Sequence, residues 1–180
     1  MTDYNRIIEK YYEPGSDAYN LVVTHSRQVA EYAMDIIDRK HLDVDRDFVY
    51  AAAMLHDLGV FATHAPSIFC NGDRPYLMHG LIGAELLRKE GPEYEPYARV
   101  CERHIGAGLT AEEIIDQKLP LPAADYLPET VEEKLVCYAD NFFSKSHIAP
   151  ARTLEKVKQS MKAYGQGTVD RLNEMIQMFE

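Results

Sequence analysis

The stretch Ala51-Ala-Ala-Met-Leu-His-Asp-Leu-Gly59 decides how the rest of the chain is interpreted. Its apolar run predicts a buried helix that ends near Gly59, and His56 and Asp57 stand side by side at this end. An imidazole and a carboxylate are costly to bury unless something pairs with them. A divalent metal ion satisfies both at once, so the question is whether other segments supply further ligands.

The flanking segments predict a helical chain. Ser16 or Asp17 can cap a long helix that runs to about Lys40, and Asp45 or Asp47 can cap the next one. No segment alternates between apolar and polar residues over the length of a strand. We therefore predict an all-α fold.

The second half of the chain continues this pattern. Residues 60–75 contain several helix-breaking residues and are expected to form a loop. The segments 110–113 and 130–133 are capping boxes, each of which predicts the start of a helix. Amphipathic helices near 150–164 and 168–179 are expected to close the chain and to pack on the preceding residues.

The composition limits the class of protein. A chain of 180 residues with a hydrophobic share of 46% fits one domain over residues 1–180. The 19 basic and 29 acidic residues give a formal net charge of -10, which disfavours a nucleic-acid partner. No run approaches the roughly 18 apolar residues of a membrane helix, and the polar N-terminus lacks the apolar core of a signal peptide. Three scattered cysteines suit a reducing compartment, so we expect a cytoplasmic protein without a membrane partner.

Four further residues that can bind a metal fall on the inward faces or at the ends of other predicted helices: His25, His79, His104 and Asp140. Taken singly, each has an ordinary structural explanation, because a histidine on an apolar helix face more often bonds a carbonyl. Asp140 is equally compatible with a buried salt bridge. Together with the His-Asp pair they make four imidazoles and two carboxylates, a mixed set that suits Fe, Mn, Co, Ni or Zn. His41 and His147 sit in polar sequence and are interpreted as surface residues.

Taken in chain order, six residues resemble the H…HD…H…H…D signature of the two-metal branch of the HD-domain superfamily of metal-dependent phosphohydrolases: His25, His56, Asp57, His79, His104 and Asp140. The segment Leu55-His-Asp-Leu-Gly59 is close to the HDIG form of the motif, with leucine for isoleucine. The stretches 102–110, 128–134 and 139–141 further resemble a small HDIG-type group. The likeness spans about residues 20–145.

The resemblance implies an HD-domain helical bundle with the metal site at its centre, holding a divalent transition metal as two ions. The first ion would take His25, His56, Asp57 and Asp140. The second would take His79, His104 and the other oxygen of Asp57, which then bridges the two ions. Such ions activate a water for attack on phosphorus, so the implied substrate is a phosphate ester or anhydride of a nucleotide or another small phosphorylated metabolite.

Two residues outside the signature are candidates for further catalytic roles beside the bridging Asp57. His64, in the predicted loop 60–75, can protonate the leaving group. Lys145, five residues after Asp140, can bind a phosphate. For each, a solvent-exposed position without a catalytic role is the alternative interpretation. We expect the loop to govern substrate choice.

Departures from the better-known branches leave other functions open. Val60 and Phe61 follow the motif where deoxynucleotidase-like members carry an acidic residue, and the Gly-Tyr-Pro motif of the HD-GYP phosphodiesterases is absent. The ligand order is shared with the symmetrical diadenosine tetraphosphate hydrolases. A di-iron oxygenase of the HD fold would use the same six ligands, and a non-catalytic HD sensing module is a further alternative. An oligomer is compatible with the sequence, because the C-terminal helices can cover the core or pair two subunits.

Overall fold

The computed structural model describes residues 2–145 and 150–180, and within them the chain is mostly helical. The α-helices are α1 (Tyr4–Ile8), α2 (Asp17–Lys40), α3 (Arg46–Leu55), α4 (His79–Glu90), α5 (Glu95–Arg103), α6 (Ala111–Asp116), α7 (Val131–Asp140), α8 (Leu154–Met161) and α9 (Gln166–Phe179). The 3₁₀ helices are η1 (Leu58–Ala62), η2 (Pro66–Ile68), η3 (Tyr76–Met78), η4 (Pro92–Tyr94) and η5 (Lys162–Tyr164). The all-α prediction is confirmed. Among the described residues, no helix has the length and apolar character needed to cross a membrane.

Local sequence determines where the main helices begin. The side chains of Ser16 and Asp45 accept hydrogen bonds from the first backbone N–H groups of α2 and α3. Thr110 and Thr130 form complete capping boxes, in which the glutamate three residues later accepts from the backbone of the threonine. These caps satisfy N–H groups that a helix start otherwise leaves without partners.

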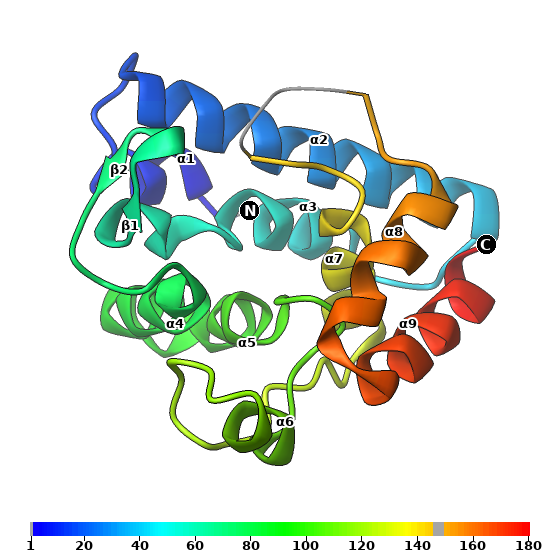
Figure 1. Cartoon of the computed structure of the whole chain (residues 1–180). Coiled ribbons are helices and arrows are strands. Elements are labelled where there is room, and N and C mark those ends of the chain that lie inside the picture. The colour runs from blue at the N-terminus through cyan, green and yellow to red at the C-terminus, as the bar shows by residue number, and fades with distance from the viewer. Residues whose placement is uncertain (1, 146–149) are drawn as a thin grey trace.

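The helices are arranged around α3. In Figure 1, α2 crosses above α3, the α4–α5 pair lies below it, and α7 runs beside it. The C-terminal helices α8 and α9 contact each other, and α9 contacts α7. One cluster of buried apolar side chains includes residues from every α-helix except α6. The C-terminal end of α3, which carries the His-Asp pair, therefore points into the interior of the molecule.

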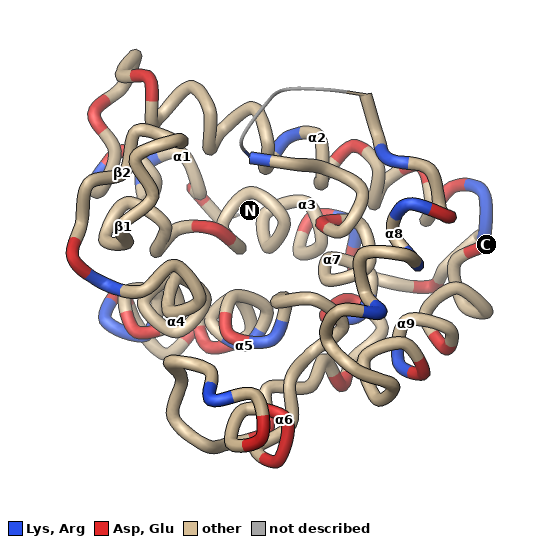
Figure 2. Tube along the Cα trace, in the orientation of Figure 1, with Lys and Arg blue, Asp and Glu red and all other residues tan. Residues whose placement is uncertain are grey.

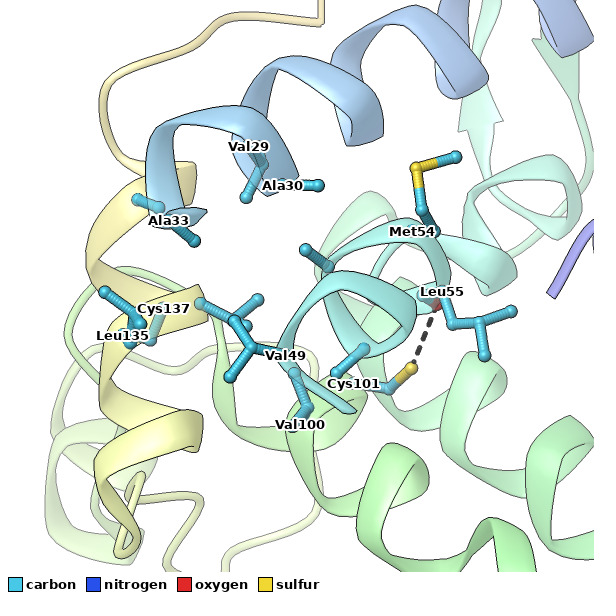
Figure 3. Packing of buried hydrophobic residues seen from close by; sticks show 14 of the residues in the cluster. Val29, Ala30, Ala33, Val49, Met54, Leu55, Val100, Cys101, Leu135 and Cys137 are labelled. Carbon is cyan, nitrogen blue, oxygen red and sulfur yellow. Dashed lines mark hydrogen bonds between the residues drawn. The ribbon is translucent and has the colours of Figure 1, made fainter. Parts of the chain in front are cut away.

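Small side chains allow the central helices to approach closely. Figure 3 shows Val29 and Ala33 of α2 directed toward Val49 of α3 and Leu135 of α7. On the other side of α3, the thiol of Cys101 donates to the carbonyl oxygen of Leu55 at 3.2 Å. This bond ties α5 to the last turn of α3, one residue before the His-Asp pair.

The segment after the HD motif differs from the predicted loop. Residues 58–62 form η1, and a two-residue strand β1 (His64–Ala65) pairs antiparallel with β2 (Cys70–Asn71). The predicted loop therefore contains a small hairpin. Its strands are too short to show alternation in sequence. A Cβ atom on Gly72 would lie 2.1 Å from the carbonyl oxygen of Ala62, so the hairpin folds back on η1 only because residue 72 is glycine.

Two other glycines bring the site-bearing segments together. A Cβ atom on Gly59 would lie 2.2 Å from the carbonyl oxygen of His79, and one on Gly80 would lie 2.5 Å from that of Cys101. These contacts hold η1 against the start of α4 and α4 against the end of α5. The glycines thereby place three segments that carry histidines side by side.

Candidate metal centre

The six predicted ligands lie together in the structure. They come from the middle of α2, the break between α3 and η1, the start of α4, the residue after α5 and the end of α7: His25, His56, Asp57, His79, His104 and Asp140. The first five are buried, with at most 3% of the residue exposed. The side chain of Asp140 is 15% exposed, so the cluster reaches the surface at this residue. That these side chains bind a metal stays a prediction.

The carboxylate of Asp57 lies between two pairs of histidines. Its Oδ2 is 3.3 Å from Nε2 of both His25 and His56. Its Oδ1 is 3.5 Å from Nε2 of both His79 and His104. Each oxygen thus faces its own pair of imidazole nitrogens.

Asp140 belongs to one side of this arrangement. Its Oδ1 is 2.9 Å from Nε2 of His25 and 3.4 Å from Nε2 of His56. We call His25, His56 and Asp140 the Oδ2 half of the site, and His79 and His104 the Oδ1 half. The halves share Asp57 and differ in charge, because only the Oδ2 half has a second carboxylate.

Backbone carbonyls orient three of the histidines. Nδ1 of His56, His79 and His104 lies 2.6, 2.6 and 2.7 Å from the carbonyl oxygen of the residue three positions earlier. Because a carbonyl only accepts, each Nδ1 must donate its proton, and the neutral ring presents a lone pair at Nε2. Metal-binding histidines are commonly held in this way by a second hydrogen bond.

The buried polar atoms fit a bound cation. Nε2 of His79 and Nε2 of His104 are 3.0 Å apart. With both Nδ1 atoms protonated, two neutral rings would direct their lone pairs at each other. Both oxygens of Asp57 and Nε2 of His25 and His56 are buried and have no hydrogen-bond partner among residues 2–145 and 150–180. Such atoms are costly to bury, and a divalent transition metal would satisfy this nitrogen and oxygen set.

Burial and neighbouring charges shift the pKa values of His79 and His56 in opposite directions. Burial lowers the pKa of His79 to about 3, so this ring is neutral at neutral pH. Burial also opposes a charge on His56, but the neighbouring Asp57 and Asp140 carboxylates raise the pKa of His56 to about 10. Burial raises the pKa of Asp57, yet the positive charges of His56 and Lys145 hold it well below its usual range. Without a metal, cationic side chains therefore neutralise the Oδ2 half.

Lys145 lies at the Oδ2 half. Its Nζ is 3.0 Å from Oδ2 of Asp57 and 3.8 Å from Oδ1 of Asp140, and its side chain is only 12% exposed. Burial disfavours the ammonium charge, but the two carboxylates outweigh it and raise the pKa of Lys145. The interpretation of Lys145 as a solvated surface residue is therefore wrong, while its catalytic role stays a prediction.

His64 is not among the clustered side chains. It is exposed on β1, and it lines a cavity of about 630 Å³ that also contacts Asp140 and Lys145. The cavity thus connects the proposed leaving-group acid with the open side of the cluster. His41 is exposed, as expected, whereas His147 lies outside the described residues.

The cavity includes residues that the sequence did not single out. Tyr76 precedes α4, Asn141 follows α7, and Arg152 and Tyr164 flank α8. Arg152 and Tyr164 lie beyond the HD-like stretch, where no motif or spacing marked them. Asn141 follows Asp140 directly, and its amide donates to the carbonyl oxygen of Gly106 at 2.7 Å.

Comparison with known proteins agrees with this geometry. The family model described as HD domain matches residues 22–144. Uncharacterized protein MJ0778 of Methanocaldococcus jannaschii is 44% identical over 123 residues, which are 67% of this chain and 64% of that protein. The crystal structure titled L. monocytogenes phosphodiesterase PgpH HD domain aligns with a TM-score of 0.58 and 16% identity, over 99% of this chain and 96% of that chain. At this identity the likeness concerns the fold.

Two longer archaeal proteins are also similar. Both are named tRNA (cytidine(56)-2'-O)-methyltransferase and come from Picrophilus torridus and Thermoplasma volcanium. They are 40% and 34% identical to this chain over 138 and 144 residues. The matched parts are 77% and 80% of this chain but only 36% and 37% of those proteins. The chain therefore spans under two thirds of the first relative and about a third of the other two.

Proposed function

We propose that this chain, which belongs to the HD-domain family, is a metal-dependent phosphohydrolase. The substrate class is a phosphate ester or anhydride of a nucleotide or another small phosphorylated metabolite. The observation that carries the proposal is the position of Asp57, whose two oxygens face different histidine pairs. Divalent ions bound there would supply an activated water and offset charge on the phosphoryl oxygens.

The ligand assignment follows the two halves of the site. In the Oδ2 half, His25, His56 and Asp140 would hold one ion together with Oδ2 of Asp57. In the Oδ1 half, His79 and His104 would hold a second ion together with Oδ1 of the same carboxylate. Asp57 is then the shared ligand, and its loss affects both halves.

Lys145 is proposed to bind a phosphoryl oxygen of the substrate. Its Nζ lies 3.0 Å from Oδ2 of Asp57, and the side chain borders the cavity. An ammonium group in this position can pair with a phosphate without leaving the site. In a largely dry site, such a charge stabilises the transition state more than it would in water.

His64 is proposed to protonate the leaving group. It lies in the cavity wall on β1, where its backbone N–H donates to the carbonyl oxygen of Arg74 at 2.8 Å. The residue is exposed, so a substrate in the cavity can reach its imidazole. A proton donor at this place can serve a leaving group that extends from the cluster into the cavity.

The comparisons support phosphate chemistry without identifying a substrate. The solved HD domain with the same fold is titled a phosphodiesterase. The methyltransferase name belongs to proteins of which this chain covers only 36% and 37%. The formal net charge of -10 favours a small-molecule substrate over a nucleic acid. We also propose that the protein is cytoplasmic.

The test is hydrolysis of a panel of aryl phosphates, sugar phosphates and nucleotides by protein loaded with Mn²⁺, Fe²⁺, Co²⁺, Ni²⁺ or Zn²⁺. We expect turnover of at least one phosphoester and its loss in Asp57→Asn, with Asp116→Asn on the exposed face of α6 as the matched control. Metal-loaded protein that is inert on the whole panel would contradict the proposal. Turnover that needs both iron and O₂ would point to the oxygenase instead.

A further inference from the structure

We infer that the substrate carries a second anionic group, which Arg152 binds in the cavity beside the metal centre. This inference rests on the proposed function for the phosphoryl group that reacts. The inference is carried by the position of Arg152, which has no carboxylate partner among the described residues and lines the same cavity as Lys145 and Asp140.

The cavity is much larger than a phosphate. Its volume of about 630 Å³ is within the range of pockets that enclose whole small molecules. Most of its lining comes from three parts of the chain, residues 64–68, residues 140–145 and the segment from Arg152 to Tyr164, and Tyr76 and Gly106 complete it. A phosphoryl group beside Lys145 would leave most of this space for the rest of the substrate.

The charge of the cavity contrasts with that of the chain. Among the described residues that line it, Asp140 is a proposed ligand, and the other charged side chains are Lys145 and Arg152. A separate hollow of about 910 Å³ near the start of α3 is lined by six carboxylates and Arg99. Acidic residues are spread along this chain of formal net charge -10 (Figure 2). The cavity beside the candidate metal centre differs, because it is lined by two cationic side chains and one carboxylate.

Arg152 is available to bind a ligand. Seven other arginines pair with carboxylates: Arg6, Arg39, Arg46, Arg88, Arg99, Arg103 and Arg171. In the described part of the chain no such ion pair involves Arg152, which is exposed. An unpaired guanidinium presents a planar set of donors that matches a phosphate or carboxylate.

The backbone fixes Arg152 close to the site. Its N–H donates to the carbonyl oxygen of Phe142 at 2.8 Å, and Phe142 is only two residues past Asp140. The backbone of Arg152 is therefore held at the same end of α7 that carries the proposed ligand. Tyr76 and Tyr164, 37% and 40% exposed, also line the cavity and can cover an apolar or aromatic spacer. The inferred substrate is a small metabolite with a reacting phosphoryl group, a spacer and a second phosphate or carboxylate.

Equilibrium binding tests this inference without turnover. The probes are α,ω-alkane bisphosphonates with two to six carbons, ω-phosphonocarboxylates of the same lengths, and the matching monophosphonates. Each is titrated into Mn²⁺-loaded protein by calorimetry. We expect at least one two-anion probe to bind about tenfold or more tightly than its monophosphonate, as an added charge-assisted hydrogen bond implies. The better series identifies the second group as phosphate or carboxylate.

Two variants test whether the preference for two-anion probes depends on Arg152. In Arg152→Met the advantage of the two-anion probe should disappear, while the affinity for the monophosphonate changes by less than about twofold. Arg27→Met, at an exposed position of α2 outside the cavity, should keep the advantage. Because Arg152 is exposed, its variant should melt at the wild-type temperature. The inference is overturned if no two-anion probe is preferred, or if the preference survives in Arg152→Met.

Different results would contradict the phosphohydrolase proposal and the second-anion site. Hydrolysis of the phosphoester panel without a two-anion preference would overturn only the second-anion site. An Arg152-dependent preference in a protein that hydrolyses no phosphoester would support the anion site and contradict the phosphohydrolase. Failure of every phosphonate to bind would overturn the inference.

Discussion

The two halves of the candidate metal centre share the carboxylate of Asp57, and each has two buried histidines, yet they differ in charge. The Oδ2 half adds Asp140 and has the Lys145 ammonium 3.0 Å from Oδ2 of Asp57. The Oδ1 half has only His79 and His104, with their Nε2 atoms 3.0 Å apart. A half with a second carboxylate and a half without one therefore lie on opposite oxygens of Asp57.

This difference predicts the order in which the two halves bind metal ions. A carboxylate-rich half attracts a divalent ion more strongly than a pair of neutral imidazoles. We therefore expect the Oδ2 half to bind metal first and more tightly. The Oδ1 half should fill second and should depend more on Asp57, which supplies its one negative oxygen.

The largest effect is expected when the shared ligand is removed. Asp57→Asn keeps the shape of the side chain but removes the charge from both halves. We expect metal content measured by plasma emission to fall to near zero, and phosphoester turnover to fall by more than about 10³-fold. Asp116→Asn should retain both. Metal retained in full by Asp57→Asn, in protein with wild-type circular dichroism, would contradict the bridging role.

The next largest effect is expected when a ligand is removed from only one half of the site. His104→Gln removes a ligand from the Oδ1 half alone, so we expect metal content to drop from two equivalents to one, with turnover reduced by about 10²-fold or more. His25→Gln damages the half that binds first and should weaken uptake of the first equivalent. If His104→Gln abolished all binding and His25→Gln did not, the order of filling would be the reverse.

A smaller effect is expected from the lysine. Lys145→Met should reduce turnover by about 10²-fold, because it removes a charge from the phosphoryl position. Its metal affinity should be equal to that of the wild type or higher, since an ammonium group no longer competes for Oδ2 of Asp57. Lys89→Met, on the exposed face of α4, is the matched control. Loss of metal together with activity in Lys145→Met would assign the residue a structural role.

The smallest effect concerns the pH dependence of the metal-free protein. His79 has a pKa of about 3, lowered chiefly by burial, against an ordinary value of 6.5. As the pH falls below 6.5 the unfolded chain gains a proton that the folded protein does not, so stability decreases. Melting temperatures of chelator-treated protein should therefore fall by several degrees between pH 6.5 and 4.5. His56, with its pKa raised to about 10, is already protonated in the folded protein over this window. The unfolded chain completes its protonation at His56 as the pH falls from 6.5, which offsets only a small part of the decrease.

His79→Gln isolates that contribution. Because the amide does not titrate, the variant should lose less of its melting temperature between pH 6.5 and 4.5 than the wild type does. An identical decrease in both proteins would show that His79 is not held neutral by burial.

The helices and the ligand positions were predictable because local chemistry determines them. Ser16, Asp45 and the threonines at 110 and 130 cap helices through bonds to residues three positions away. His25 was placed inward by the period of the apolar face of α2, and the structure buries it. These signals are contained within single helices, so they can be read without knowing the tertiary structure.

The cavity and the division of the Asp57 carboxylate were not predictable from local sequence. Arg152 reaches the site only because its backbone bonds Phe142, and η1 reaches α4 only because Gly59 has no side chain. The hairpin at 64–71 depends on the close approach of Gly72 to Ala62. Contacts between distant residues decide each of these features. The sequence indicates the division of the Asp57 oxygens only through the family resemblance, and the distances to the four histidines agree with it.

The most direct test of the shared carboxylate is anomalous scattering from crystals of the protein loaded with Mn²⁺. The account predicts two anomalous peaks about 3.5–4 Å apart, one beside each oxygen of Asp57, with the stronger peak in the Oδ2 half next to Asp140. A single peak that does not contact Asp57, or no peak among the four histidines, would contradict it.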